Sequence, residues 1–100
     1  MEMADRFAVQ FAAAFSALTP TRQALLSLIY GHRMRKADAG RVLGMRDYAV
    51  SRELRAAMEH LRERLEAANP GTWTQAAVER WTEAWAELSE STEVGVRHDA

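Results

Sequence analysis

Arginine and small polar side chains line one side of a predicted helix in the middle of the chain. Over residues 47–64, the outward-facing positions are Ser51, Arg52, Arg55, Glu59, Arg62 and Glu63. An arginine can donate two parallel hydrogen bonds to O6 and N7 of guanine, and its charge attracts phosphate. The chemistry that this face offers is therefore recognition of a nucleic acid by hydrogen bonding and charge.

Two helices and a tight turn are predicted to position this face. The inner side of the second helix carries apolar residues at helical spacing, namely Val50, Leu54, Ala57, Met58, Leu61 and Leu65. A short helix is expected over residues 36–43, and Gly44 follows it, where a helix end favours a residue that tolerates positive φ. Asp47 is the expected N-cap of the second helix. These parts make up a helix-turn-helix, whose second helix enters the DNA major groove.

The rest of the chain also has helical patterns, so the predicted fold is all-α. Phe7, Phe11 and Phe15 recur every four residues and predict an amphipathic helix over residues 3–18, with the Phe stripe in the core. Thr19 suits the N-cap of the next helix and Pro20 its first position. That helix is expected to end near Tyr30 and Gly31. The first domain would then span residues 1–68 and contain four helices.

A strong turn signal, Asn69-Pro70-Gly71, separates this domain from a C-terminal segment, residues 69–100. Thr72 and Gln75 fit a capping box, which predicts that an amphipathic helix begins at Thr72. Its apolar stripe would consist of Val78, Trp81, Trp85 and Leu88. Residues 91–100 show no periodicity and are expected to be frayed.

Composition argues against several classes of function. The chain has no Cys, and its three His share no metal-ligand spacing, so we expect no metal site and no other cofactor. No nucleophile motif or glycine-rich phosphate loop occurs, so an enzyme is not expected. The sequence contains no long apolar run and no signal peptide, which predicts a cytoplasmic protein without a membrane partner.

Charge is unevenly distributed along the chain. Residues 33–64 contain nine Lys or Arg and five Asp or Glu, whereas residues 65–100 contain two and seven. The basic part coincides with the predicted helix-turn-helix. The net charge of −1 is low for a protein that binds DNA unaided. The protein is therefore expected to depend on a partner for part of its affinity.

Between residues 18 and 65, a leucine-proline start, an apolar helix, a glycine turn and a spaced Val, Ala and Leu-Arg run follow one another. The residues are Leu18, Pro20, Arg22, Leu25, Leu26, Leu28, Gly31, Leu43, Gly44, Met45, Val50, Ala57, Leu61 and Arg62. This succession, about half of the chain, resembles region 4 of bacterial RNA polymerase sigma factors, which reads a promoter element. LuxR-type regulators share the glycine-turn-valine pattern, but the spacing from Ala57 to Leu61-Arg62 favours the sigma family.

The resemblance implies which residues contact promoter DNA. The base-reading positions would be Asp47, Tyr48, Ser51 and Arg52, with Arg52 the best single candidate for guanine. The phosphate contacts would come from Arg33, Arg35, Lys36, Arg46 and Arg55. The resemblance also implies that the module docks on RNA polymerase through the flap of the β subunit.

Three positions depart from the expected pattern. Gly40 stands where the family has a helix-favouring Ala, Arg46 stands where a Ser or Thr normally caps the recognition helix, and Ala49 stands where Thr or Arg is frequent. Glu53 is a separate concern. Glu53 places a negative charge beside the bases, which would repel phosphate unless it accepts from a cytosine amino group or packs against an Arg.

The C-terminal helix leaves two interpretations open, because sigma region 4 normally ends before it. Trp81 and Trp85 could cover the core formed by the first helices. Alternatively Trp81, Trp85 and Leu88 could dock a partner, such as a regulator or anti-sigma protein, or a second copy of the chain. The acidic segment could also shield the basic helix until a partner displaces it.

Two functions therefore follow from the sequence. The leading one is a DNA-binding transcription module that reads a promoter with the helix at 47–64 and docks on RNA polymerase. The alternative is a sigma-like adaptor, or an anti-sigma or co-sigma protein, that binds polymerase or a regulator without reading DNA. A dimeric regulator of the LuxR sort is a third possibility.

Overall fold

The computed structural model describes the backbone of residues 2–99 and the side chains of residues 6–88. Over this range the chain is all-helical, as predicted. The elements are α1 (Glu2–Ser16), α2 (Pro20–Leu26), a short π-helix η1 (Ser27–Gly31), α3 (Lys36–Leu43), α4 (Asp47–Ala68) and α5 (Gln75–Asp99). None of the described helices is both long enough and apolar enough to cross a membrane.

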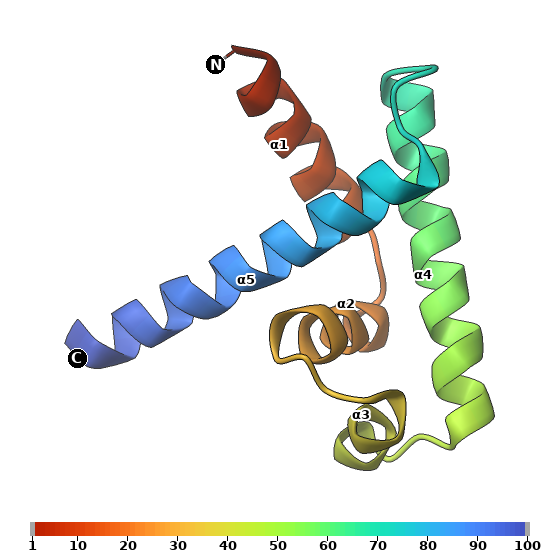
Figure 1. The fold of residues 1–100 in the computed structure, drawn as a ribbon, viewed down its shortest axis with the longest axis vertical. Coiled ribbons are helices and arrows are strands. Elements are labelled where there is room, and N and C mark those ends of the chain that lie inside the picture. Colours follow the sequence, from red (N-terminus) through yellow and green to blue (C-terminus); the bar gives the residue numbers. More distant parts are fainter. Residues whose placement is uncertain (1, 100) are drawn as a thin grey trace.

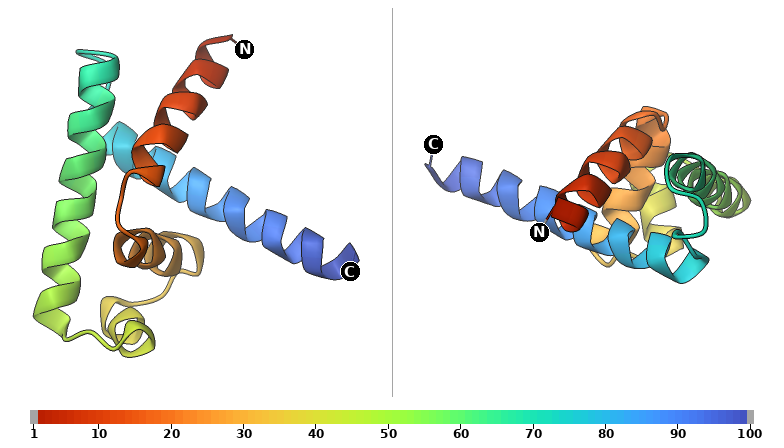
Figure 2. Two further views of the ribbon diagram at one scale, coloured as in Figure 1. Left: turned by 180° about the vertical axis from the view of Figure 1, so that it is seen from behind. Right: turned by 90° about the horizontal axis from the view of Figure 1, so that it is seen from above.

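The long helix α4 runs along one side of the molecule and packs against the other helices (Figure 1). Its first half contacts α2 and α3, and its second half contacts α1 and α5. Figure 2 shows that the later part of α5 projects away from this body. The start of α4 and the short helix α3 together form the opposite end of the molecule from α1.

Local sequence signals account for the start of α2 and the end of α3. The Thr19 hydroxyl accepts a hydrogen bond from the Arg22 N–H at 3.2 Å, and Pro20 occupies the first position of α2, as predicted. Gly44 ends α3 with a left-handed φ of 68°, and the Met45 N–H donates to the Gly40 carbonyl at 2.7 Å. The predicted bounds of α3 are thus confirmed.

The second predicted helix does not stay α-helical to Tyr30. It widens into η1 after Leu26, and the His32 N–H donates to the Ser27 carbonyl at 3.1 Å. Arg33 then adopts a left-handed φ of 58°, while the Met34 N–H donates to the Leu28 carbonyl at 3.0 Å. Arg33 therefore ends this helix in a conformation that glycine adopts more easily.

Two predictions at the ends of α4 are wrong. Arg46, with ψ of 155°, holds the N-cap position without a side-chain hydrogen bond, and Asp47 is the first helical residue. There its carboxylate still lies in the first turn, where the partial positive charge of the helix favours an acid. The helix continues past Arg64 to Ala68, because Leu65 remains in the core and good helix formers follow it.

The start and the end of the last helix also differ from prediction. Thr72 lies in a turn, where its N–H donates to the Asn69 carbonyl at 3.3 Å, and Thr74 caps α5 by accepting from the Ala77 N–H at 3.1 Å. The predicted capping box is therefore wrong. Burial of Trp73 ahead of the cap delays the start of the helix. The backbone of α5 is helical to Asp99 instead of being frayed from residue 91.

Six aromatic rings belong to the main core or pack against it, and we call them the aromatic cluster: Phe7, Phe11, Phe15, Trp73, Trp81 and Trp85. Phe11 is fully buried and lies 6.3, 6.1 and 5.7 Å from the ring centroids of Phe15, Trp81 and Trp85. The predicted Phe stripe thus lies in the core, and it joins α1 to α5.

A smaller group of buried residues, which we call the aliphatic cluster, holds α2, α3 and the start of α4 together. It consists of Leu25, Ala39 and Val50, surrounded by the partly buried side chains of Leu28, Ile29, Met34, Leu43 and Met45. Gly40 allows this close approach, because a Cβ there would meet the Met45 carbonyl oxygen at 2.8 Å and Val50 Cγ2 at 3.1 Å. The absence of a side chain at position 40 therefore has a packing reason.

Candidate nucleic-acid interface

The four predicted base-reading residues share the exposed side of the first turns of α4. Asp47, Tyr48, Ser51 and Arg52 are all exposed, whereas Val50 and Leu54 on the inner side of the same helix are buried. The α3 helix packs behind this part of α4, and α5 meets α4 further along (Figures 1 and 2). The structure thus brings these four side chains to one uncovered end of the molecule.

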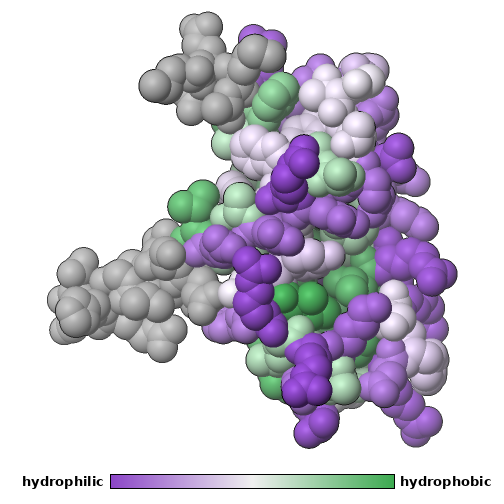
Figure 3. Space-filling model, viewed as in Figure 1, coloured by the Kyte–Doolittle hydropathy of each residue, from purple (hydrophilic) through white to green (hydrophobic). Residues whose placement is uncertain are grey.

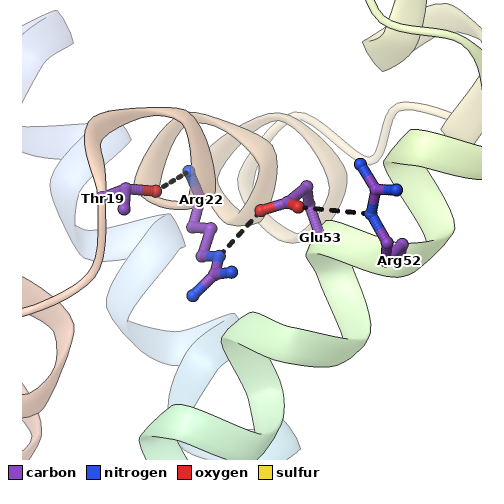
Figure 4. Close-up of polar contacts among 4 residues, drawn as sticks. All are labelled: Thr19, Arg22, Arg52 and Glu53. Atoms are coloured by element: carbon purple, nitrogen blue, oxygen red, sulfur yellow. Dashed lines mark hydrogen bonds and ion pairs between the residues drawn. The ribbon is translucent and has the colours of Figure 1, made fainter.

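Arg52 lies between two side chains that can orient it. Its guanidinium carbon is 5.8 Å from the centroid of the Tyr48 ring, one helical turn earlier. Arg52 Nε also lies 3.6 Å from Glu53 Oε2. The other carboxylate oxygen, Oε1, accepts a hydrogen bond from Arg22 Nε at 2.9 Å (Figure 4).

Glu53 is therefore not a free negative charge beside the proposed base readers. The hydrogen bond from Arg22, assisted by the charges of Arg22 and Arg52, lowers the pKa of the Glu53 carboxyl below its usual value. Figure 4 shows that this carboxylate joins α4 to the start of α2. Glu53 is thus packed against an Arg, as its place on this face requires. The sequence analysis named Arg22 only as part of the family pattern and did not place it at the site.

The five predicted phosphate contacts are all exposed but do not form one patch. Lys36 and Arg55 border the same groove, whereas Arg33 turns toward α5. Arg33 Nη2 donates to Glu87 Oε1 at 2.8 Å, and its Nη1 lies 4.0 Å from Glu83 Oε1. Because these carboxylates already neutralise Arg33, it is the weakest of the five candidates for a phosphate.

The groove beside Lys36 has a volume of about 370 Å³ and lies between η1, the start of α3, α4 and the start of α5. It is lined by Tyr30, Lys36, Ser51, Leu54, Arg55, Met58, Glu59 and Gln75. Figure 3 shows hydrophobic groups on this face between α5 and α4, with hydrophilic groups around them. The groove continues from the proposed base-reading face, with which it shares Ser51.

Tyr30 of η1 lines the groove and lies near the acidic side chains of α5. Partial burial of its phenol, together with the negative charges of Glu79 and Glu83, raises its pKa above the usual value. The hydroxyl therefore stays protonated at neutral pH. It can donate a hydrogen bond but adds no charge to the groove.

Trp81 and Trp85 lie mostly within the protein, whereas Leu88 is exposed. Both indoles face α1, and the Trp85 ring is also 6.2 Å from that of Phe15. These contacts favour the interpretation in which the two tryptophans cover the core. Of the three predicted docking residues, Leu88 has the most exposed side chain, at 65%.

Trp73 is a large core residue that the sequence analysis missed. It is buried to 2% exposure and packs edge-on against Phe7, with ring centroids 5.6 Å apart. A local signal was present, since Trp73 directly precedes the N-cap Thr74 and Val78 lies at the fourth helical position. This spacing is that of a hydrophobic staple, and both residues belong to the same core.

Among the described side chains, no group of three His, Asp or Glu could hold a metal ion. Comparison of the chain with protein-family models, with curated proteins and with solved structures finds no significant match. Any assignment of function therefore depends on the residues and geometry described above.

Proposed function

We propose that the protein is a DNA-binding transcription module of the sigma region 4 type. In this proposal α3 and α4 form a helix-turn-helix, and the first turns of α4 enter the major groove. The main support is that Tyr48, Ser51 and Arg52 are exposed together on those turns, while α3 packs behind them. Arg35, Lys36, Arg46 and Arg55 would contact the phosphates on either side.

The charge balance supports dependence on a partner protein. The whole chain has a net charge of −1, and Arg33 is already paired with Glu83 and Glu87. A few phosphate contacts give weak, strongly salt-dependent binding. We therefore propose RNA polymerase as the partner that holds the module at a promoter, with the β-subunit flap as its docking point by resemblance.

A second function is favoured by the same ion pairs. If the acidic face of α5 removes cations from the DNA surface, the scaffold could serve as an adaptor, or as an anti-sigma or co-sigma protein, that binds polymerase without reading DNA. The exposed Leu88 on α5 would then belong to the docking surface. In this case the ion pair between Glu53 and Arg22 would have no role in DNA recognition.

Selection from a random-sequence duplex pool tests the leading proposal. The wild-type chain should enrich a short motif, and the affinity for that motif should fall steeply with salt. Arg52→Ala should weaken binding to the motif by about fivefold or more, the loss expected for one guanine contact. Arg62→Ala is the matched control, because Arg62 is exposed on the same helix almost three turns later.

The alternative function gives a different result in the same experiment. No motif would be enriched, and purified RNA polymerase would retain the chain after nuclease treatment. That combination would reject DNA reading and support an adaptor. Enrichment of a motif that Arg52→Ala binds equally well would reject the assigned orientation of α4.

A further inference from the structure

We propose that Glu53 is a positioning residue, which Arg22 holds in place so that it orients the Arg52 guanidinium toward one guanine. The inference rests on the proposed DNA-reading function and adds to it a determinant of specificity outside the exposed reading face. It assigns a role to the acidic side chain that is otherwise least suited to a DNA surface.

The two oxygens of the Glu53 carboxylate serve two different arginines. Oε1 accepts from Arg22 Nε at 2.9 Å, and Oε2 lies 3.6 Å from Arg52 Nε (Figure 4). Arg22 comes from the first turn of α2, which is 31 residues away in sequence. The carboxylate is thus fixed to a neighbouring helix as well as to its own.

Exposure decreases from the reading residue to its support. The Arg52 side chain is 67% exposed, whereas those of Glu53 and Arg22 are 24% and 26% exposed. The better buried pair is less screened by solvent and less free to change rotamer than an exposed pair. Arg22 and Glu53 therefore form the fixed side of the arrangement, and Arg52 the side that faces outward.

The contact with Glu53 does not occupy the part of Arg52 that would bind guanine. It engages Nε, so the two terminal nitrogens, Nη1 and Nη2, remain to donate to O6 and N7. The Tyr48 ring limits the guanidinium from a second direction. A side chain that is held in this way loses less conformational entropy when it binds, and it matches fewer alternative bases.

If Glu53 positions Arg52, its substitution should have a different effect than if Glu53 acts only through its charge. Loss of the Glu53 carboxylate removes a negative charge from the face, so simple electrostatics predicts binding that is equal or tighter on every sequence. Loss of positioning predicts weaker discrimination at one guanine. Discrimination is therefore the quantity to measure.

The experiment uses the full chain and the duplex that wild type selects from a random pool. Each guanine of the motif is replaced in turn by 7-deazaguanine, which lacks the N7 acceptor. For wild type, one replacement should weaken binding by about fivefold to tenfold, and Arg52→Ala should abolish that effect. Glu53→Gln and Arg22→Met should reduce it to about twofold or less, with unchanged salt dependence.

Matched variants separate positioning from other effects. Glu63→Gln makes the same charge change on an exposed part of α4 and should keep the full 7-deazaguanine effect. Arg22→Lys retains a cation beside Glu53, so its 7-deazaguanine effect should be larger than that of Arg22→Met. Circular dichroism and thermal unfolding confirm that each variant is folded, and nitrogen relaxation of Arg52 Nε in the free protein should show greater motion in Glu53→Gln.

Each contrary outcome has a defined meaning. If Glu53→Gln keeps the full effect, Glu53 does not position Arg52, although DNA reading stands. Suppose that Arg22→Met keeps the full 7-deazaguanine effect, while Glu53→Gln changes the preference of the protein at a cytosine of the motif. Glu53 then contacts a base itself, and the inference is wrong. If wild type enriches no motif at all, the proposed function fails and the inference fails with it.

Discussion

The two ends of α4 differ in what surrounds them. The second half of the helix packs against α1 and α5 around the aromatic cluster, which contains six large rings. The first half packs against α2 and α3 around the aliphatic cluster, in which only Leu25, Ala39 and Val50 are fully buried. Its opposite side is exposed and carries the candidate DNA-contacting residues.

Under the proposed function, this difference separates the part of α4 that stabilises the fold from the part that contacts DNA. Burial of aromatic side chains contributes most to the free energy of unfolding, because each removes a large apolar area from water. The end with the small cluster depends more on close backbone contact and on a polar connection between Arg22 and Glu53. Substitutions at the two ends should therefore have different consequences.

The largest effect is expected at the aromatic cluster. Phe11→Ala should lower the free energy of unfolding by about 3–5 kcal/mol, because Phe11 is fully buried among three other rings. Thermal unfolding by calorimetry measures this loss. Val9→Ala, on the exposed side of the same helix, should change stability by less than about 0.5 kcal/mol. Similar losses in both variants would contradict the assigned packing of α1.

A smaller effect is expected where α3 meets α4. Gly40→Ala should lower the free energy of unfolding by about 1–2 kcal/mol, because the clash with the Met45 carbonyl outweighs the higher helix propensity of Ala. Urea unfolding measures the change, and DNA binding should fall with it. As a control, Ala37→Gly makes the opposite exchange at an exposed site of α3. It should lower the free energy of unfolding by at most about 1 kcal/mol, the difference in helix propensity. If Gly40→Ala were more stable than wild type, α3 would lie further from Met45 and Val50 than these distances indicate.

The polar connection at this end should give a pH-dependent contribution. The pKa of Glu53 is lower in the folded protein than its usual 4.5, so the contribution is present above that pH and is lost as pH falls through the folded-state pKa. Wild type should thus be more stable than Glu53→Gln at pH 7, and the difference should vanish in acid. Chemical denaturation at several pH values measures it, and a difference that persists in acid would exclude ionisation of Glu53 as its cause.

The smallest effect is expected at Arg33, the connector between the two ends. Arg33→Gly relieves the left-handed φ of 58° but removes the exposed ion pairs to Glu83 and Glu87, and these terms nearly cancel. Stability should therefore change by less than about 0.5 kcal/mol. Arg33→Ala loses the ion pairs without relieving the backbone, and should be about 1 kcal/mol less stable than Arg33→Gly. Equal stabilities would show that the backbone conformation carries no cost.

The parts of the fold that could be predicted from the sequence are those with local causes. The buried stripe from Val50 to Leu65 follows from helical periodicity, and the end of α3 follows from Gly44. The cap at Thr74 was missed because Thr72 offered a competing local motif, and burial of Trp73 decided between them. The widening of α2 into η1 has no signal that we recognise in the sequence.

The candidate site was predictable only in part for the same reason. The exposed positions on α4 follow from its inner stripe, since the outer face is what remains. The pairing of Glu53 with Arg22 joins residues 31 apart, and the pairing of Arg33 with Glu87 joins residues 54 apart. Such contacts depend on how the helices pack, which residue types and spacing do not determine.

The location of the tryptophans has a spectroscopic consequence. All three, Trp73, Trp81 and Trp85, belong to the aromatic cluster, and the end of the molecule formed by α3 and the start of α4 contains none. Intrinsic tryptophan fluorescence therefore reports the state of one end alone. If the α3 end opens locally before the rest unfolds, fluorescence will stay native while far-ultraviolet circular dichroism already falls.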